Sequence, residues 1–236
     1  MAAGLAKTGK TVFLTSFACF SPAINWAVIK QSIAYNKADV KIVGSHAGLM
    51  SEELGATHQM LEDVALMRTM PNMEVMAPID AIETERVVRV LANSRRPAYL
   101  RLVRPVTEIW PGRRKGFTIC KAEVLKKGKK MTILGYGPIL ISVWDKVKDR
   151  DVELINCSSI KPLDEETILR SVKKTGECVV VEDHQKNGGL GEAVASLLLR
   201  KGVKCKFRHW GVEDEFGKSG KDYNELWKLY KLIPSL

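Results

Sequence analysis

A short apolar strand runs directly into a polar loop in the stretch Val40-Lys-Ile-Val-Gly-Ser-His-Ala-Gly-Leu-Met-Ser-Glu-Glu-Leu-Gly-Ala-Thr-His-Gln59. The β-branched run at 40–43 predicts a buried strand. The loop that follows is the densest polar cluster of the chain, and it holds His46 and His58. Ligands of open α/β sheets gather at the carboxyl ends of the strands. The two histidines are therefore well placed to bind phosphate or hydroxyl groups, or to move protons.

The alternation of strands and helices continues on both sides of this stretch. The other predicted strands are short apolar runs at residues 11–15, 73–76, 98–102, 131–134, 152–155, 178–181 and 204–207. Helical patterns separate them, at residues 22–35, 81–93, 139–147 and 190–200, and in the segment that Asp164 caps. This β-α-β alternation predicts an α/β fold made of two open, mostly parallel sheets.

A basic turn separates the two blocks of this pattern. Proline and glycine residues bracket it, so we expect one domain at 1–110 and a second at 111–236 that begins with a basic linker at 111–118. The chain carries 37 Lys and Arg against 27 Asp and Glu, and the stretch from Arg113 to Lys130 is strongly basic. Nucleic-acid binding is not expected, because Phe117 is the single aromatic residue in this stretch that could stack on a base. A solvated face, attraction of phosphorylated metabolites or contact with an acidic partner explains the charge better.

The composition is that of a soluble globular protein, with 45% hydrophobic and 27% charged residues among 236. No apolar run approaches the roughly 20 residues that cross a bilayer, and the first residues lack the apolar core of a signal peptide. We therefore expect a cytoplasmic protein that does not bind a membrane. Five widely spaced cysteines are typical of reduced thiols. Methionines concentrate between Met50 and Met76, where they fill a core or an interface, and we expect an oligomer interface near Leu61–Met76.

Other candidate side chains follow predicted strands. Arg101 and Arg104 come at the end of the strand at 98–102, where a guanidinium group suits a phosphate or a carboxylate. Phe17 and Phe20 follow the first strand and are spaced to frame a planar ring. Taken alone, a surface salt bridge is the simpler explanation of the arginines, and core packing that of the phenylalanines. The two loop histidines lack a third ligand at a recognisable spacing, so no metal site is expected in this chain.

A series of short motifs resembles the C-terminal half of transketolase, and most closely the split form whose two halves are separate subunits. The motifs include Ala2-Ala-Gly-Leu-Ala6, Ser16-Phe-Ala-Cys-Phe20, Lys41-Ile-Val-Gly-Ser-His-Ala-Gly48, Gly55-Ala-Thr-His-Gln59, Arg101-Leu-Val-Arg104, Ile160-Lys-Pro-Leu-Asp-Glu-Glu166 and Gly188-Gly-Leu-Gly-Glu-Ala193. Each motif is weak alone. Their order and spacing together are specific, and they cover the chain nearly end to end.

The resemblance implies a pyrimidine-binding domain followed by a transketolase C-terminal domain, in an enzyme that transfers a two-carbon ketol unit between the phosphorylated sugars of pentose phosphate metabolism. Thiamine diphosphate would lie between this chain and an N-terminal transketolase subunit, which would hold the diphosphate and Mg²⁺ or Ca²⁺. Phe17 and Phe20 match the aromatic residues that pack on the aminopyrimidine. His46 and Arg104 match positions that bind the sugar phosphate. His58 matches a substrate-binding, catalytic histidine near the reacting centre, and two copies of each subunit are expected to assemble.

Three departures from the family pattern affect this expectation. The glutamate that activates the cofactor lies upstream of Ala2 in the family, so we expect a truncated start and a chain that is inactive alone. Leu54 stands where the family has an aspartate that contacts the donor's hydroxyl, and Ala23 stands where some relatives add a third aromatic residue. The alternatives are another member of the superfamily, either a deoxyxylulose-phosphate synthase or the beta subunit of a 2-oxoacid dehydrogenase, and a non-catalytic structural subunit.

Overall fold

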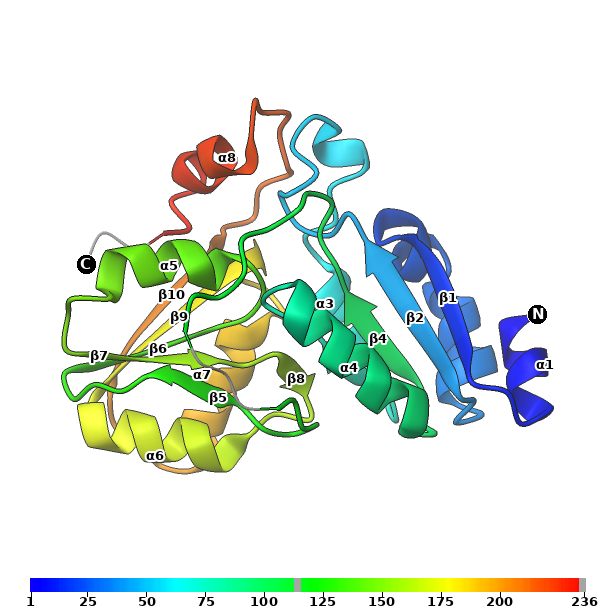
Figure 1. The fold of residues 1–236 in the computed structure, drawn as a ribbon, viewed down its shortest axis with the longest axis horizontal. Coiled ribbons are helices and arrows are strands. Elements are labelled where there is room, and N and C mark those ends of the chain that lie inside the picture. The colour runs from blue at the N-terminus through cyan, green and yellow to red at the C-terminus, as the bar shows by residue number, and fades with distance from the viewer. Residues whose placement is uncertain (113–115, 234–236) are drawn as a thin grey trace.

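The computed structural model describes residues 1–112 and 116–233, so part of the expected linker at 111–118 lies outside the described residues. Two five-stranded sheets stand side by side (Figure 1). The first has the order β1 (Val12–Phe17), β2 (Val40–Ser45), β4 (Ala98–Arg101), β3 (Glu74–Met76) and β8 (Ser159–Lys161). Its strands are parallel except β8, which pairs antiparallel with β3. A strand from the second block of the sequence therefore completes the first sheet.

The second sheet confirms the predicted α/β fold of mostly parallel strands. Its order is β10 (Lys206–Val212), β9 (Glu177–Gln185), β6 (Met131–Gly135), β7 (Val152–Asn156) and β5 (Glu123–Lys126). All are parallel except β5, which runs antiparallel along β7. The sequence analysis missed β5 and β8, because strands of three or four residues with charged members show no clear periodicity.

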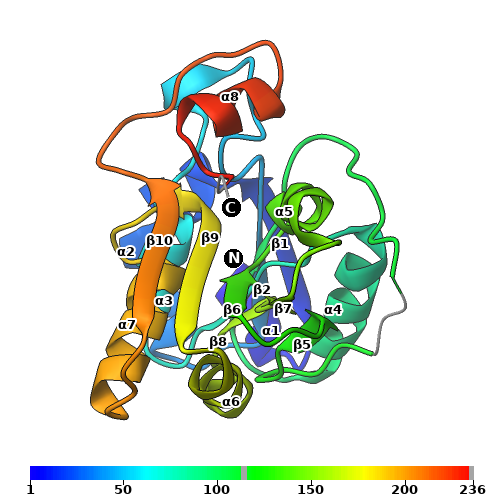
Figure 2. The ribbon, with the colours of Figure 1, turned by 90° about the vertical axis from the view of Figure 1, so that its left-hand side faces the viewer.

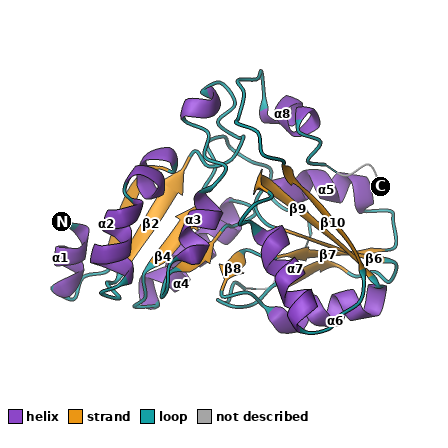
Figure 3. Ribbon diagram, turned by 180° about the vertical axis from the view of Figure 1, so that it is seen from behind, coloured by secondary structure: helices purple, strands orange, loops and turns teal. Residues whose placement is uncertain are grey.

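Helices cover both faces of the first sheet. On one face lie α1 (Ala2–Lys7), α3 (Asp63–Thr69) and a helical segment built from η1 (Cys19–Ile24), α2 (Trp26–Val28) and η2 (Ile29–Ala34), and on the other lies α4 (Ala81–Asn93) (Figures 1 and 3). The predicted helix at 22–35 corresponds to this segment. Its regular part follows Ser21, whose extended backbone (φ −140°, ψ 105°) suits the residue before a proline.

The second sheet is also covered on both faces. Helices α6 (Glu165–Thr175) and α7 (Leu190–Arg200) pack on one face, and α5 (Ile139–Val147) and α8 (Tyr223–Leu229) belong to the core on the other (Figure 2). Alternation along β6 shows this division, because Ile133 joins the core with α5 and Leu134 joins the core with α7. Asp164 caps α6 as predicted, accepting a hydrogen bond from the Thr167 N–H at 3.1 Å.

One hydrophobic core joins the two sheets, with side chains from β2, α3, β9 and α7 in the same cluster. The methionines of the region 50–76 are buried inside this chain, and they are Met50, Met60, Met67, Met70, Met73 and Met76. These adaptable side chains therefore fill the chain's own interior, and an oligomer interface near Leu61–Met76 stays a prediction. All five cysteines are free thiols. No helix within the described ranges is long and apolar enough to cross a membrane.

Candidate functional site

The carboxyl ends of β1 and β2 bring four of the predicted site residues into one ring cluster. Phe17 ends β1 and Phe20 lies in η1, while His46 and His58 come from the connection after β2, before and after the short turn η3 (Gly55–Thr57). The Phe17 ring stacks on His46 with centroids 3.7 Å apart, and it is parallel within 7° to the Phe20 ring at 5.8 Å. His58 meets both phenylalanine rings edge-on, at 6.3 and 5.6 Å. Parallel pairing of β1 with β2 makes these distant sequence positions neighbours.

Each histidine of the cluster contacts a neighbouring hydroxyl through Nδ1. That atom lies 3.1 Å from Ser45 Oγ in His46 and 2.8 Å from Thr57 Oγ1 in His58. The opposite nitrogen, Nε2, is the one that a ligand would meet. His46 also has a left-handed backbone with φ +59°, a conformation that is uncommon for a non-glycine residue and concentrates at functional sites. Burial, then the charges of Arg104 and His58, lower the pKa of His46 below its ordinary 6.5, so this imidazole is neutral at pH 7.

The two arginines at the end of β4 have different surroundings. Arg101 is buried, its Nε lies 2.9 Å from the Asp63 carboxylate, and its guanidinium also donates to a main-chain carbonyl. Arg101 therefore forms a buried ion pair, and not the surface salt bridge that the sequence suggested. The Arg104 side chain is 37% exposed, pairs with Glu53 at 3.0 Å, and acts electrostatically on His46. Arg104 is thus the cation that the structure brings beside the ring cluster.

The ring cluster fits the aminopyrimidine that the resemblance implies. Phe20 is 40% exposed and lies parallel to Phe17, so apolar ring faces are presented at the strand ends. A planar heteroaromatic ring packs favourably against such faces. Within residues 1–112 and 116–233, no group of three or more His, Cys, Asp or Glu is arranged to hold a metal ion.

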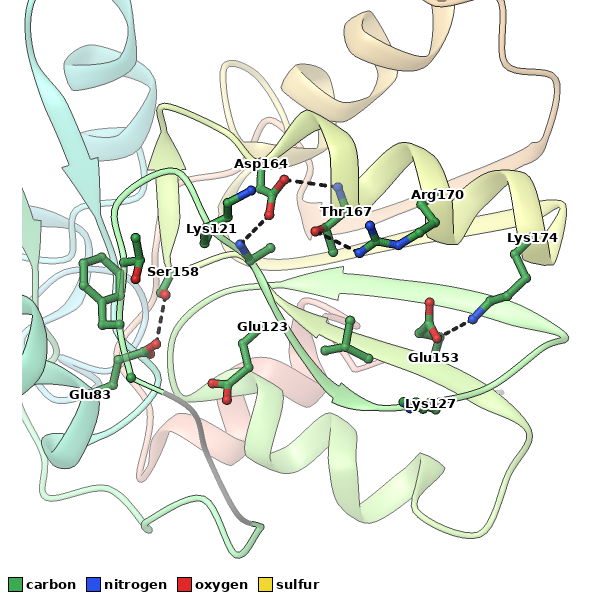
Figure 4. Close-up of a pocket in the computed structure, with 15 residues that line it drawn as sticks. Glu83, Lys121, Glu123, Lys127, Glu153, Ser158, Asp164, Thr167, Arg170 and Lys174 are labelled. Carbon is green, nitrogen blue, oxygen red and sulfur yellow. Dashed lines mark hydrogen bonds and ion pairs between the residues drawn. The ribbon is translucent and has the colours of Figure 1, made fainter.

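A cavity of about 970 Å³ lies elsewhere, between β5, β7 and α6 (Figure 4). Several of its charged groups bind one another or the cavity wall. Lys174 pairs with Glu153, and the Asp164 carboxylate accepts from the Thr167 N–H in the first turn of α6 and from the Ala122 N–H just before β5. None of the five predicted site residues lines it. This cavity is therefore separate from the ring cluster of Phe17, Phe20, His46 and His58.

Sequence analysis missed the buried carboxylates behind the site. The N–H groups of the Gly188–Gly191 turn surround one of these carboxylates, because Glu182 accepts from Leu190 N at 2.8 Å and from Gly191 N at 2.9 Å. His209, which had no visible partner in the sequence, lies 2.7 Å from the same carboxylate. The available signal was an acidic pair directly after the buried run 178–181, at the carboxyl end of a strand.

Comparison with known proteins identifies the class to which this fold and site belong. Residues 1–108 match the family model described as "Transketolase, pyrimidine binding domain", and residues 120–235 match "Transketolase, C-terminal domain". The chain belongs to the transketolase family.

Three of the relatives share about three quarters of their length with this chain. The "Putative transketolase C-terminal section" of Methanocaldococcus jannaschii is 42% identical over 240 residues, which cover 98% of this chain and 74% of that protein. An apulose-4-phosphate transketolase subunit of Phocaeicola vulgatus is 34% identical, covering 98% of this chain and 75% of that protein. A solved structure titled "Split gene transketolase, inactive beta4 tetramer" superimposes with a TM-score of 0.89 at 35% identity, covering 98% of this chain and 75% of that one.

Proposed function

We propose that this chain is the C-terminal subunit of a two-subunit transketolase that moves a two-carbon ketol unit between phosphorylated sugars. The cluster of Phe17, Phe20, His46 and His58 carries this proposal, because it combines apolar ring faces with two imidazoles beside the guanidinium of Arg104. Relatives named as transketolase subunits, and the likeness to a split-gene transketolase tetramer, support a partner subunit and an oligomeric assembly.

The roles of the side chains follow from their chemistry. Phe17 and Phe20 would pack on the aminopyrimidine, while the partner subunit would hold the diphosphate and Mg²⁺ or Ca²⁺. Thiamine diphosphate, when bound, supplies the nucleophilic carbon that takes up the ketol unit. His46 and Arg104 would bind the sugar phosphate, whose remote binding energy orients the sugar. His58 would hydrogen-bond to a substrate oxygen and move a proton there.

The surroundings of His46 suit phosphate binding. The Ser45 hydroxyl donates to the Ser16 carbonyl at 3.2 Å, so its oxygen accepts from Nδ1–H of His46, and Nε2 of the neutral ring is left as an acceptor. Nε2 can take up the proton of a phosphate monoester and then donate it in a hydrogen bond to a phosphate oxygen, and the adjacent Arg104 adds a full positive charge. Glu53, which pairs with Arg104 at 3.0 Å, would be displaced from the guanidinium as the phosphate binds.

The test is ketol transfer by the full chain mixed with its N-terminal subunit, thiamine diphosphate and magnesium. We expect transfer from xylulose phosphate to an aldose phosphate acceptor in the mixture and none from either subunit alone. A Phe20→Ala variant should bind the cofactor more weakly in the same assembly, because one of the two ring faces is lost. A complete mixture that binds the cofactor and gives no ketol transfer would refute the proposal.

Leu54 favours testing a second donor, since it places a hydrocarbon side chain where the family pattern has a donor-binding aspartate. Pyruvate offered in place of xylulose phosphate separates transketolase from a deoxyxylulose-phosphate synthase or a 2-oxoacid dehydrogenase subunit. An assembly that holds the cofactor and uses neither donor would instead contain this chain as a non-catalytic structural subunit.

A further inference from the structure

Groups from the second half of the chain hold the segment that carries His46 and His58. We call residues 46–59 the histidine loop. On its outer side, the Gly220 N–H donates to the Glu52 carbonyl at 2.9 Å, and the Gln59 side chain donates to the Lys218 carbonyl at 3.0 Å. Figure 1 shows the chain before α8 running beside this loop. The loop thus lies between the first sheet and the second half of the chain.

Asp183 makes the most buried of these contacts. It lies at the carboxyl end of β9 and is 4% exposed, and both of its carboxylate oxygens accept from the Leu49 N–H, at 3.0 and 3.1 Å. Its own carbonyl accepts from Arg101 Nη2 at 2.7 Å. Gly48 permits this approach, since its φ is +73° and a Cβ there would strike the carboxylate and lie 2.9 Å from Arg101 Nη2.

Loss of this contact would leave a buried main-chain donor without a partner. Leu49 is completely buried, so without Asp183 its N–H would lack an acceptor in a site closed to water. Burial raises the pKa of Asp183, while Arg101 and the Leu49 N–H oppose that rise. The hydrogen bond from the loop backbone therefore offsets part of the free-energy cost of burying a carboxylate at this position.

We propose that Asp183 is a positioning residue, which fixes the histidine loop from the second sheet and so sets the placement of His46 and His58. The kinetic consequence rests on the proposed function, but the positioning itself does not. The second sheet contributes no ring to the cluster of Phe17, Phe20, His46 and His58. It acts on that cluster through the Asp183 side chain.

Hydrogen exchange of the full chain tests the positioning directly. Asp183→Ala should speed exchange of the amides at 47–50 by at least about tenfold, because the Leu49 N–H loses its acceptor. Asp183→Asn should restore most of the protection, since an amide oxygen still accepts. Lys161→Met is the matched control, because Lys161 donates to the Arg68 and Met70 carbonyls, a contact between the two halves that lies outside the loop. Unchanged exchange at 47–50 in Asp183→Ala, or equal acceleration throughout both sheets, would overturn the inference.

Kinetics of the complete assembly provide the second readout. Asp183→Ala should raise KM for the phosphorylated sugar about tenfold through His46 and lower kcat through His58, with Asp183→Asn close to wild type and Lys161→Met unchanged. A faster-exchanging loop with wild-type KM and kcat would show that the loop's placement is not used, and would overturn the inference. If the wild-type assembly transfers no ketol unit, the proposed function fails while the exchange data still decide whether Asp183 holds the loop.

Discussion

Replacing Arg101 by methionine tests the buried ion pair that Arg101 forms with Asp63 within the first half of the chain. The Arg101 and Asp63 side chains are 3% and 0% exposed and lie 2.9 Å apart. In Arg101→Met the Asp63 carboxylate stays buried with the Tyr99 hydroxyl, at 2.7 Å, as a remaining donor. Removing one member of a buried pair costs about 3–5 kcal/mol, because the other charge is left uncompensated. For a chain of this length the Tm should fall by roughly 6–20 °C.

Arg104→Met is the matched control, because it removes an ion pair from the same strand end at a position open to water. The paired side chains of Arg104 and Glu53 are 37% and 65% exposed. Solvent screening limits their contribution to less than about 1 kcal/mol. Denaturant unfolding of both variants at one protein concentration gives the comparison. Similar losses in the two, or a loss below about 1 kcal/mol in Arg101→Met, would show that burial does not decide the strength of these pairs. Adding Asp63→Asn to Arg101→Met should recover part of the stability, since a neutral amide is cheaper to bury than a carboxylate.

Three further predictions follow from the same structure. Arg104→Met and His46→Ala should each raise KM for phosphorylated sugars about 10- to 100-fold in the complete assembly, since each removes one hydrogen bond to a charged group. KM for an unphosphorylated analogue should stay unchanged. Equal effects on both substrates would contradict the phosphate role. Burial, Arg104 and the neighbouring histidine lower the pKa of His46 in the folded chain. The contribution of the neutral imidazole to stability is therefore complete above the ordinary pKa of 6.5 and is lost as the pH falls below it. His46→Phe should accordingly lose less stability than the wild type between about pH 7 and about pH 5. An equal loss in the two proteins would disprove this. Glu182→Gln should cost about 1–3 kcal/mol in denaturant unfolding, because Leu190 and Gly191 donate to different carboxylate oxygens and the amide NH2 that replaces one of them cannot accept. Glu192→Gln, on the exposed side of the same turn, is the control.

Local patterns predicted most of the elements. The helix at 81–93 and the helix at 190–200 have the bounds that the apolar spacing indicated. Most strands lie within a few residues of their predicted ranges, because buried parallel strands are continuous apolar runs. The sequence also placed Phe17, Phe20, His46 and His58 after strand ends, where an open sheet gathers its ligands.

Pairing between distant segments could not be predicted from such patterns. Nothing local distinguishes Arg101, whose carboxylate partner is Asp63, from Arg104 three residues later. The hydrogen bonds from the Gly188–Gly191 turn to the Glu182 carboxylate likewise depend on how β9 and α7 pack.

The sequence by itself determined the fold class, the family and the set of side chains available for chemistry, because these follow from periodicity, motif order and residue type. The tertiary structure decided which of these side chains act together. Stacking of Phe17 on His46 follows from the pairing of β1 with β2. The hydrogen bond from the Leu49 N–H to the Asp183 carboxylate joins residues 134 positions apart, and it follows from the packing of the second sheet against the first. Burial and charge pairing are properties of that packing, and no local stretch of sequence contains them.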